Sequence, residues 1–206
     1  YVDTVSTQPL LARLPTAGAV AATTANNAFG ITEWRLGNGV RVVLKPTSYK
    51  DDEILFRAVS PGGTSLAADR DFVAAVTAPE VVEQGGLGAF RNVDLQKVLA
   101  GTTAVVRADI GPTEEGLAGG SARRDLEKMF QLIYLRFTAP RADPVAFGVL
   151  KDQLKVALAN QQSMPETVFD DAVSAALTQN HLRAQPLTPA RLVPIAVSIG
   201  STRDDW

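Results

Sequence analysis

Cysteine is absent from this chain of 206 residues, and His181 is its one histidine. Without cysteine the chain cannot form a disulfide bond, bind a metal through thiolates or use a cysteine nucleophile. A metal site built from one histidine and carboxylates would rest on oxygen ligands, which suit calcium or magnesium better than zinc. The absence of cysteine leaves the compartment open, because such a chain folds in reducing and oxidising surroundings alike.

An excess of one charge, aromatic side chains and long apolar runs are also lacking. There are 20 lysines and arginines against 22 aspartates and glutamates, and aromatic residues make up 6%. The chain therefore has no basic stripe for phosphates and few rings on which bases could stack. No apolar run is long enough to cross a bilayer, and the first residues do not show the pattern of a signal peptide. We expect neither a nucleic-acid partner nor a membrane span.

Apolar residues are plentiful, at 46%, which is enough for the core of one domain. Residues 1–30 are rich in alanine, threonine and proline and show no period, so we predict a linker or N-terminal extension there, with linker over 16–27. Residues 31–187 are predicted to form the domain. Residues 188–206 are predicted to be a C-terminal segment, truncated from a following domain.

The first half of the chain predicts β-strands with two helices between them. The strongest signal is Gly37-Asn38-Gly39 between two apolar alternations, because Asn-Gly favours a hairpin in which both central residues take positive φ. A further strand is predicted over 53–59, where the turn residues 60–63 end it. Residues 103–110 alternate as a strand, and Gly111-Pro112 turns the chain toward another strand over 114–118. The predicted helices are 69–84, capped by Asp69, interrupted by Pro79 and burying Phe72, Ala75 and Val76, and 92–99, capped by Asn92.

The second half predicts three helices from apolar residues at helical spacing. The first is capped by Ser121 and buries Leu126, Met129, Phe130, Ile133 and Phe137. The second begins at Asp143-Pro144 and buries Phe147, Leu150, Leu154 and Leu158. The third has a capping box of Ser163 and Glu166 and buries Val168, Phe169, Ala172 and Ala176. Strands followed by helices predict an α+β fold, with a largely antiparallel sheet and helices packed on one face.

A set of segments appears in a fixed order between Ile31 and about Leu187. They are 34–46 (Trp-Arg-Leu-Gly-Asn-Gly-Val-Arg-Val-Val-Leu-Lys-Pro), 52–56, 60–66, 93–97, 126–140 and 178–181. Together they resemble the third domain of pitrilysin/insulinase-type zinc peptidases, in the bacterial subgroup of periplasmic zinc proteases. Members of this family have four similar α/β sandwich domains, paired into two halves that close around a peptide.

The resemblance also locates a zinc motif that this chain lacks. In the family, the first domain carries H-x-x-E-H on the helix after its opening strands, with a downstream glutamate as further ligand and the motif glutamate as general base. The corresponding positions here are Thr77, Glu80 and Val81, so both histidine positions are non-ligands. The resemblance thus implies a degenerate motif, with no catalytic residue, metal ligand or cofactor in this chain. Zinc is expected in the first domain of the parent protein.

Other motifs give no competing chemistry. Gly62-Gly63 and Gly119-Gly120-Ser121 lack the lysine of a phosphate-binding loop, and turns or bulges account for them. The acidic pairs do not follow the calcium-loop pattern, and no G-x-S-x-G occurs. We expect His181 to be a helix C-terminal cap or a surface residue.

The resemblance implies a non-catalytic domain that forms part of the wall of the substrate chamber and docks against the zinc-bearing half. Its partners would be the other domains of the same polypeptide and the peptide substrate, in the periplasm or cell envelope. Two alternatives stay open: a scaffold or assembly subunit, and a free-standing peptide-binding module that uses a sheet edge. An H-x-x-E-H domain upstream in the same reading frame would favour the first interpretation.

Overall fold

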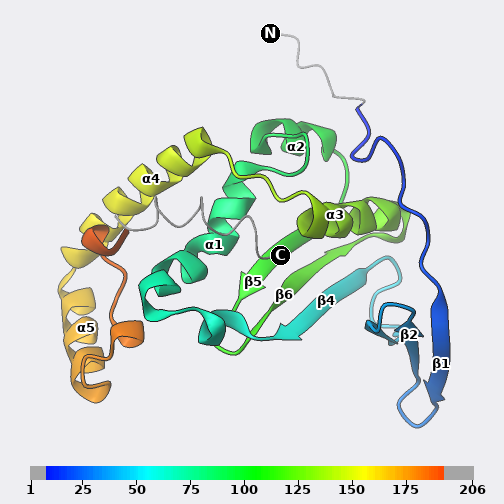
Figure 1. Ribbon diagram of the computed structural model, residues 1–206, viewed down its shortest axis with the longest axis horizontal. Helices are drawn as coiled ribbons and strands as arrows, with labels where there is room; N and C mark the ends of the chain where they lie inside the picture. Colours follow the sequence, from blue (N-terminus) through cyan, green and yellow to red (C-terminus); the bar gives the residue numbers. More distant parts are fainter. Residues whose placement is uncertain (1–7, 193–206) are drawn as a thin grey trace. The chain divides into compact units, whose positions relative to one another are not determined.

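The computed structural model describes residues 8–192, which form two compact units (Figure 1). One unit is Leu11–Glu53, and the other comprises the chain from Ile54 onward together with the residues up to Leu10. The predicted division at residues 30 and 187 stays a prediction, and most of the segment 188–206 lies outside the described residues.

The unit Leu11–Glu53 is a three-stranded antiparallel sheet in the order β1-β2-β3. Its strands are β1 (Val20–Asn26), β2 (Ile31–Leu36) and β3 (Arg41–Leu44). The prediction of a linker over 16–27 is wrong, because β1 pairs along β2 from Val20 opposite Leu36 to Asn26 opposite Ile31. Every residue of β1 is exposed, so the strand has no buried face and leaves no alternation in the sequence.

The predicted hairpin between β2 and β3 is confirmed, but its turn differs from the expectation. Gly39 has a φ of 89°, whereas Asn38 does not take a positive φ. Gly39 N donates to Leu36 O at 2.9 Å, and Leu36 N donates to Val40 O at 2.8 Å. These bonds enclose a three-residue loop in which only the last glycine needs the left-handed conformation.

The larger unit is built on an antiparallel sheet in the order β4-β6-β5. Its strands are β4 (Ile54–Pro61), β5 (Val105–Ile110) and β6 (Glu114–Ser121), close to the predicted bounds. Alternate residues such as Val106 and Leu117 are buried on one face. The opposite face is open, since Leu55 and Val59 on β4 are exposed there.

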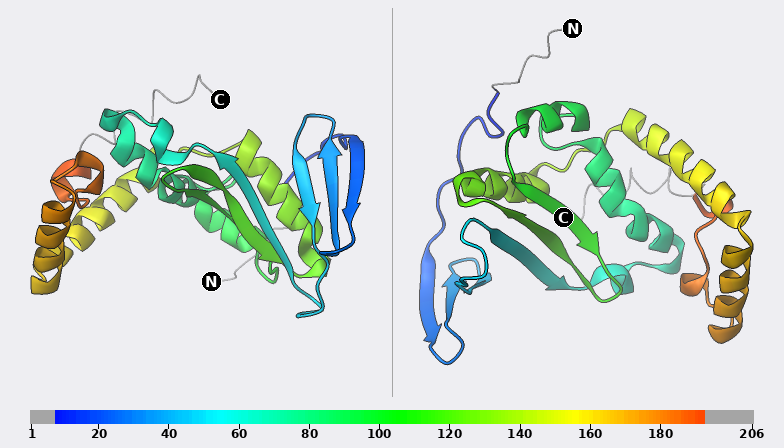
Figure 2. Two further views of the ribbon diagram at one scale, coloured as in Figure 1. Left: turned by 90° about the horizontal axis from the view of Figure 1, so that it is seen from below. Right: turned by 180° about the vertical axis from the view of Figure 1, so that it is seen from behind.

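Helices α1 (Phe72–Gly85) and α3 (Leu126–Thr138) pack on the buried face of this sheet (Figure 2). α2 (Asn92–Val98) and α4 (Pro144–Gln162) contact α1, and α5 (Pro165–Leu177) contacts α4. Short 3₁₀ helices are η1 (Gly63–Leu66), η2 (Asp69–Asp71), η3 (Arg123–Asp125), η4 (Leu182–Ala184) and η5 (Pro189–Leu192). α1 and α3 both contact β5, and α3 also contacts β6. The α+β class with helices on one face is therefore confirmed.

The sequence predicts the presence of the helices better than the residues at which they start. The predicted caps Asp69 and Ser121 are wrong, because 3₁₀ turns η2 and η3 precede α1 and α3 and move the cap positions to Asp71 and Asp125. Asn92 is the first residue of α2 rather than its cap. Pro79 lies inside α1, which continues through it without a break.

The last two helices show one correct cap and one wrong cap. Asp143 caps α4 as predicted, since its Oδ1 accepts from Val145 N at 3.0 Å and Ala146 N at 3.2 Å. The predicted capping box is wrong, because Ser163 ends α4 and its hydroxyl donates to Asn160 O at 2.6 Å. The cap position of α5 is Met164 instead.

Burial corrects the predicted inner faces. On α3, Met129 is 1% exposed, but Phe130 is 55% and Phe137 69% exposed, so the predicted face is wrong for both phenylalanines. The helix has apolar residues on two faces, and the one with Met129, Leu132 and Leu135 packs on the sheet. Val76 on α1 and the predicted inner residues of α5 (Val168, Phe169, Ala172 and Ala176) are also exposed. The predicted face of α4 is confirmed, with Leu150 buried and Phe147, Leu154 and Leu158 half-buried.

Candidate functional site

The predicted zinc-motif positions lie together in the middle of α1. Thr77 is buried, and its hydroxyl donates to Val73 O at 2.8 Å and lies 3.3 Å from Ala74 O. A threonine hydroxyl bonded in this way to the preceding turn is satisfied within its own helix. Val81, four residues on, is half-buried and has no donor atom. This pair of side chains offers no ligand set for zinc.

Glu80 is exposed on the same helix. Its carboxylate accepts a hydrogen bond from the Gln84 side-chain amide at 3.1 Å, one turn further along. The Gln84 oxygen in turn accepts from the Asn92 amide at 3.4 Å, at the start of α2. These contacts are those of a solvated helix residue that helps to join α1 to α2.

The surroundings of α1 are apolar rather than acidic. α1 contacts β5 on one side and α4 on another, and the inner residues of α4 are Phe147, Leu150 and Leu154. Among residues 8–192, no group of three or more histidines, aspartates and glutamates is placed to hold a metal ion. Within the same residues, no helix is both long and apolar enough to cross a membrane.

His181 lies at the surface, which was one of its two expected positions. It is not the C-terminal cap of α5; it stands before η4, where its Nδ1 accepts from Arg183 N at 3.3 Å. A ring nitrogen used in this way caps a short turn.

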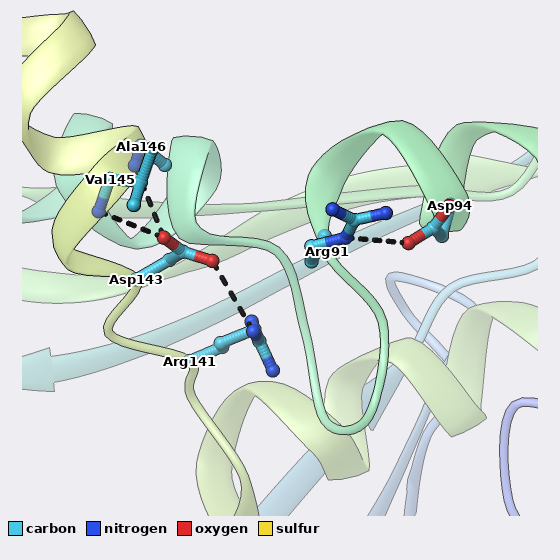
Figure 3. A network of polar contacts seen from close by, with 6 residues as sticks. All are labelled: Arg91, Asp94, Arg141, Asp143, Val145 and Ala146. Atoms are coloured by element: carbon cyan, nitrogen blue, oxygen red, sulfur yellow. Dashed lines mark hydrogen bonds and ion pairs between the residues drawn. The ribbon is translucent and has the colours of Figure 1, made fainter.

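Two groups of polar contacts lie near each other, one between the segment after α3 and the start of α4 and one at the start of α2 (Figure 3). Asp143 accepts from the first turn of α4, and its Oδ2 lies 3.3 Å from Arg141 Nη2. The backbone hydrogen bond from Ala146, followed by the side-chain bond from Arg141, holds the pKa of Asp143 below its ordinary value. Nearby, the Asp94 carboxylate bonds Arg91 Nε at 2.9 Å and raises the pKa of that guanidinium. Each charge is used in local structure.

A second network, which the sequence reasoning missed, is centred on Asp125. Its Oδ2 accepts from Thr103 N and from the Thr103 hydroxyl, both at 2.9 Å, and the hydroxyl itself accepts from Ala122 N at 2.8 Å. The backbone bond and then the side-chain bond from Thr103 lower the pKa of Asp125. An aspartate immediately before an apolar helical run is a helix-start signal, and it could have been read as one.

Arg136 is a third polar group, buried where α1, α3 and β5 meet. Its Nη2 donates to the Glu83 carboxylate on α1 and to Val106 O on β5 at 3.2 Å. A guanidinium is rarely buried without a charged partner, so Glu83 accounts for its position. The contacts tie the two main helices to the sheet.

Comparison with known proteins identifies the relatives of this fold. No protein-family model matches the chain. It is 24% identical over 169 residues to the zinc protease PQQL-like protein of Arabidopsis thaliana, covering 81% of this chain and 15% of that protein. It is 26% identical over 116 residues to the probable zinc protease PqqL of Haemophilus influenzae, covering 56% of this chain and 12% of that protein. The chain is related to pitrilysin/insulinase-type zinc peptidases.

Solved structures agree on the fold. The periplasmic protease PqqL from Escherichia coli matches 97% of this chain with a TM-score of 0.77 and 18% identity. The ferredoxin protease FusC, solved in complex with Arabidopsis ferredoxin, matches 96% with a TM-score of 0.75 and 21% identity. The match covers 22% of each of those two chains. The chain therefore corresponds to a small part of each of these proteases.

Proposed function

We propose that this chain is a non-catalytic domain of a larger zinc metallopeptidase. It forms part of the wall of the substrate chamber and docks against the half that carries zinc, while cleavage takes place elsewhere in the polypeptide. Zinc belongs to another domain of the parent protein, and the partners of this domain are its neighbours in the same chain and the peptide substrate.

The observation that carries this proposal is the chemistry of α1. A fold related to zinc proteases has a self-bonded Thr77 hydroxyl and the hydrocarbon of Val81 at the predicted motif positions. Without a bound metal there is no activated water for Glu80 to deprotonate. The contact of Glu80 with Gln84 gives this carboxylate a structural role instead.

The open face of the β4-β6-β5 sheet supports the role in a chamber wall. Leu55, Val59 and Val105 are exposed on this face. Such side chains are suited to line a space that other domains enclose, where they contribute binding and exclude water. The E. coli relative is described as periplasmic, which supports a periplasmic or cell-envelope location for the parent.

The test is made in the full-length reading frame that contains this segment. Glu80→Gln should leave cleavage of a quenched fluorescent peptide within about twofold, because Glu80 transfers no proton. Replacing the motif glutamate of the zinc domain should reduce cleavage by at least about a hundredfold. Glu127→Gln on α3 is the matched control, since Glu127 accepts from Gln131 at 3.0 Å in the same spacing.

Two results would contradict the proposal. The first is a hundredfold loss with Glu80→Gln while the protein stays folded and Glu127→Gln stays active. The second is peptide hydrolysis by the 206-residue chain alone. The proposal also predicts a positive result. The zinc-bearing half alone should cleave peptides poorly, and adding this chain together with the fourth domain should restore cleavage, because both halves of the chamber are needed to orient the peptide.

A further inference from the structure

Helix α5 has the reverse of the usual amphipathic arrangement. The residues that face α4 and the rest of the unit are half-buried and mostly polar or small: Thr167, Asp171, Ser174 and Ala175. The large apolar residues point outward, and their exposed fractions are 56% for Val168, 68% for Phe169, 40% for Val173 and 80% for Leu177. A surface helix normally buries its apolar stripe, so this stripe needs a partner.

The outward residues form one continuous surface. At about 100° per residue, the side chains of Val168, Ala172, Ala176, Phe169, Val173 and Leu177 cover half of the helix circumference. α5 lies at the end of α4, away from the β4-β6-β5 sheet (Figures 1 and 2), and all six residues of this arc are exposed. Phe169, Val173 and Leu177 are spaced four residues apart, as anchors in a helix-to-helix contact are.

The charges of α5 are all negative. It contains Glu166, Asp170 and Asp171 and no lysine, arginine or histidine. Glu166 and Asp170 are exposed and, by helical spacing, lie beside Val173 and Leu177 at one edge of the apolar arc. The exposed apolar surface around Phe130 on α3 has no such bias, because α3 carries both Glu127 and Lys128.

We propose that the outer face of α5 is a docking surface for a basic amphipathic helix. The partner helix would place leucine-sized side chains on Phe169, Val173 and Leu177, and its lysines or arginines on Glu166 and Asp170. Residues 193–206 of this chain do not have this chemistry, since they contain Arg203 against Asp204 and Asp205. This inference concerns a surface that the peptidase proposal leaves unassigned, and it does not depend on Glu80.

The experiment uses the complete chain and labelled peptides. A helical leucine–lysine peptide with one apolar face is titrated by fluorescence anisotropy, beside the same composition in scrambled order and a leucine–glutamate version. Only the ordered basic peptide should bind. Phe169→Gln and Leu177→Gln should each weaken binding at least about tenfold, because each removes a central apolar anchor. Phe130→Gln on α3 is the matched control and should change nothing.

The charge requirement is tested separately. Glu166→Gln combined with Asp170→Asn should weaken binding several-fold at low salt and remove its dependence on salt. Circular dichroism checks that each variant keeps its helices. Equal binding of the scrambled or acidic peptide, or no effect of Phe169→Gln, would overturn the proposal. So would self-association of the chain that Leu177→Gln abolishes, since a second copy would then be the occupant.

Discussion

Replacing the half-buried Arg183 by alanine should destabilise the larger unit more than the substitution of an exposed charge. From η4, Arg183 reaches back to the segment before α1: Nη1 donates to Thr64 O and Nη2 to Ala67 O, both at 2.7 Å. Nε bonds Asp69 Oδ1 at 2.9 Å, and the guanidinium lies 5.1 Å from the Phe72 ring centroid. One side chain thereby fastens the end of the described chain to the start of α1.

The size of the effect follows from these contacts. Hydrogen bonds from a charged donor contribute about 1.5–3 kcal/mol each, and the two carbonyl bonds count at the lower end, since water can partly replace the guanidinium. The pair with Asp69 adds little, because that carboxylate is 64% exposed. Stacking over Phe72 adds about 0.5–1 kcal/mol. We expect Arg183→Ala to lower the free energy of unfolding by about 3–4 kcal/mol, and Arg183→Lys by more than half of that.

Urea denaturation followed by far-ultraviolet circular dichroism measures this loss. The described helices α1 to α5 all lie in the larger unit, so the helical signal reports on it. Arg57→Ala is the control, because Arg57 makes one ion pair with Glu114 at 2.5 Å on the open sheet face and should matter by less than about 1 kcal/mol. Equal, small losses for Arg183→Ala and Arg57→Ala would refute the reasoning.

Three further outcomes are expected. Met129→Ala should cost about 2–5 kcal/mol and Phe130→Ala less than about 1 kcal/mol in the same assay, and a reversed order would mean that α3 is rotated. Asp125→Asn should lower the free energy of unfolding, because hydrogen bonds from Thr103 lower the pKa of Asp125 in the folded chain. The difference between the two proteins should be full above pH 3.8, the ordinary pKa of an aspartate, and should shrink as the pH falls below it. A difference that stays constant down to strongly acidic pH would contradict this. Elemental analysis after dialysis should find far less than one zinc per chain, and one tightly held zinc would contradict the assignment of the metal to another domain.

The order of strands and helices in the larger unit could be predicted because each element carries a local signal. Strands β4 and β5 alternate between a covered and an open face, and Asp143-Pro144 marks the start of α4. Strand β1 could not be predicted, since it is exposed on both faces and pairs only through its backbone. Backbone pairing leaves no pattern in side-chain polarity.

Periodicity also failed to choose between faces when a helix had more than one apolar stripe. The spacing of Leu126, Phe130 and Phe137 is as helical as that of Met129, Leu132 and Leu135, and only tertiary packing decides which stripe meets the sheet. The polar networks around Asp125 and Arg136 depend on contacts between segments that are distant in the sequence. No local sequence pattern therefore predicts their partners. The positions Thr77, Glu80 and Val81 came from resemblance, and their assignment as former motif positions stays a prediction.

The residues of helix α1 do not meet the requirements of an H-x-x-E-H zinc motif. A zinc motif needs two imidazoles one turn apart on a rigid helix face, with the general base between them. Here Pro79 stands between Thr77 and Glu80, and a proline at this position leaves the helix without one backbone donor. α1 nevertheless continues through Pro79 as one helix, which packs against β5 and α4. Packing on these elements and the hydrogen bond from the Thr77 hydroxyl to Val73 O are the contacts that hold this part of α1.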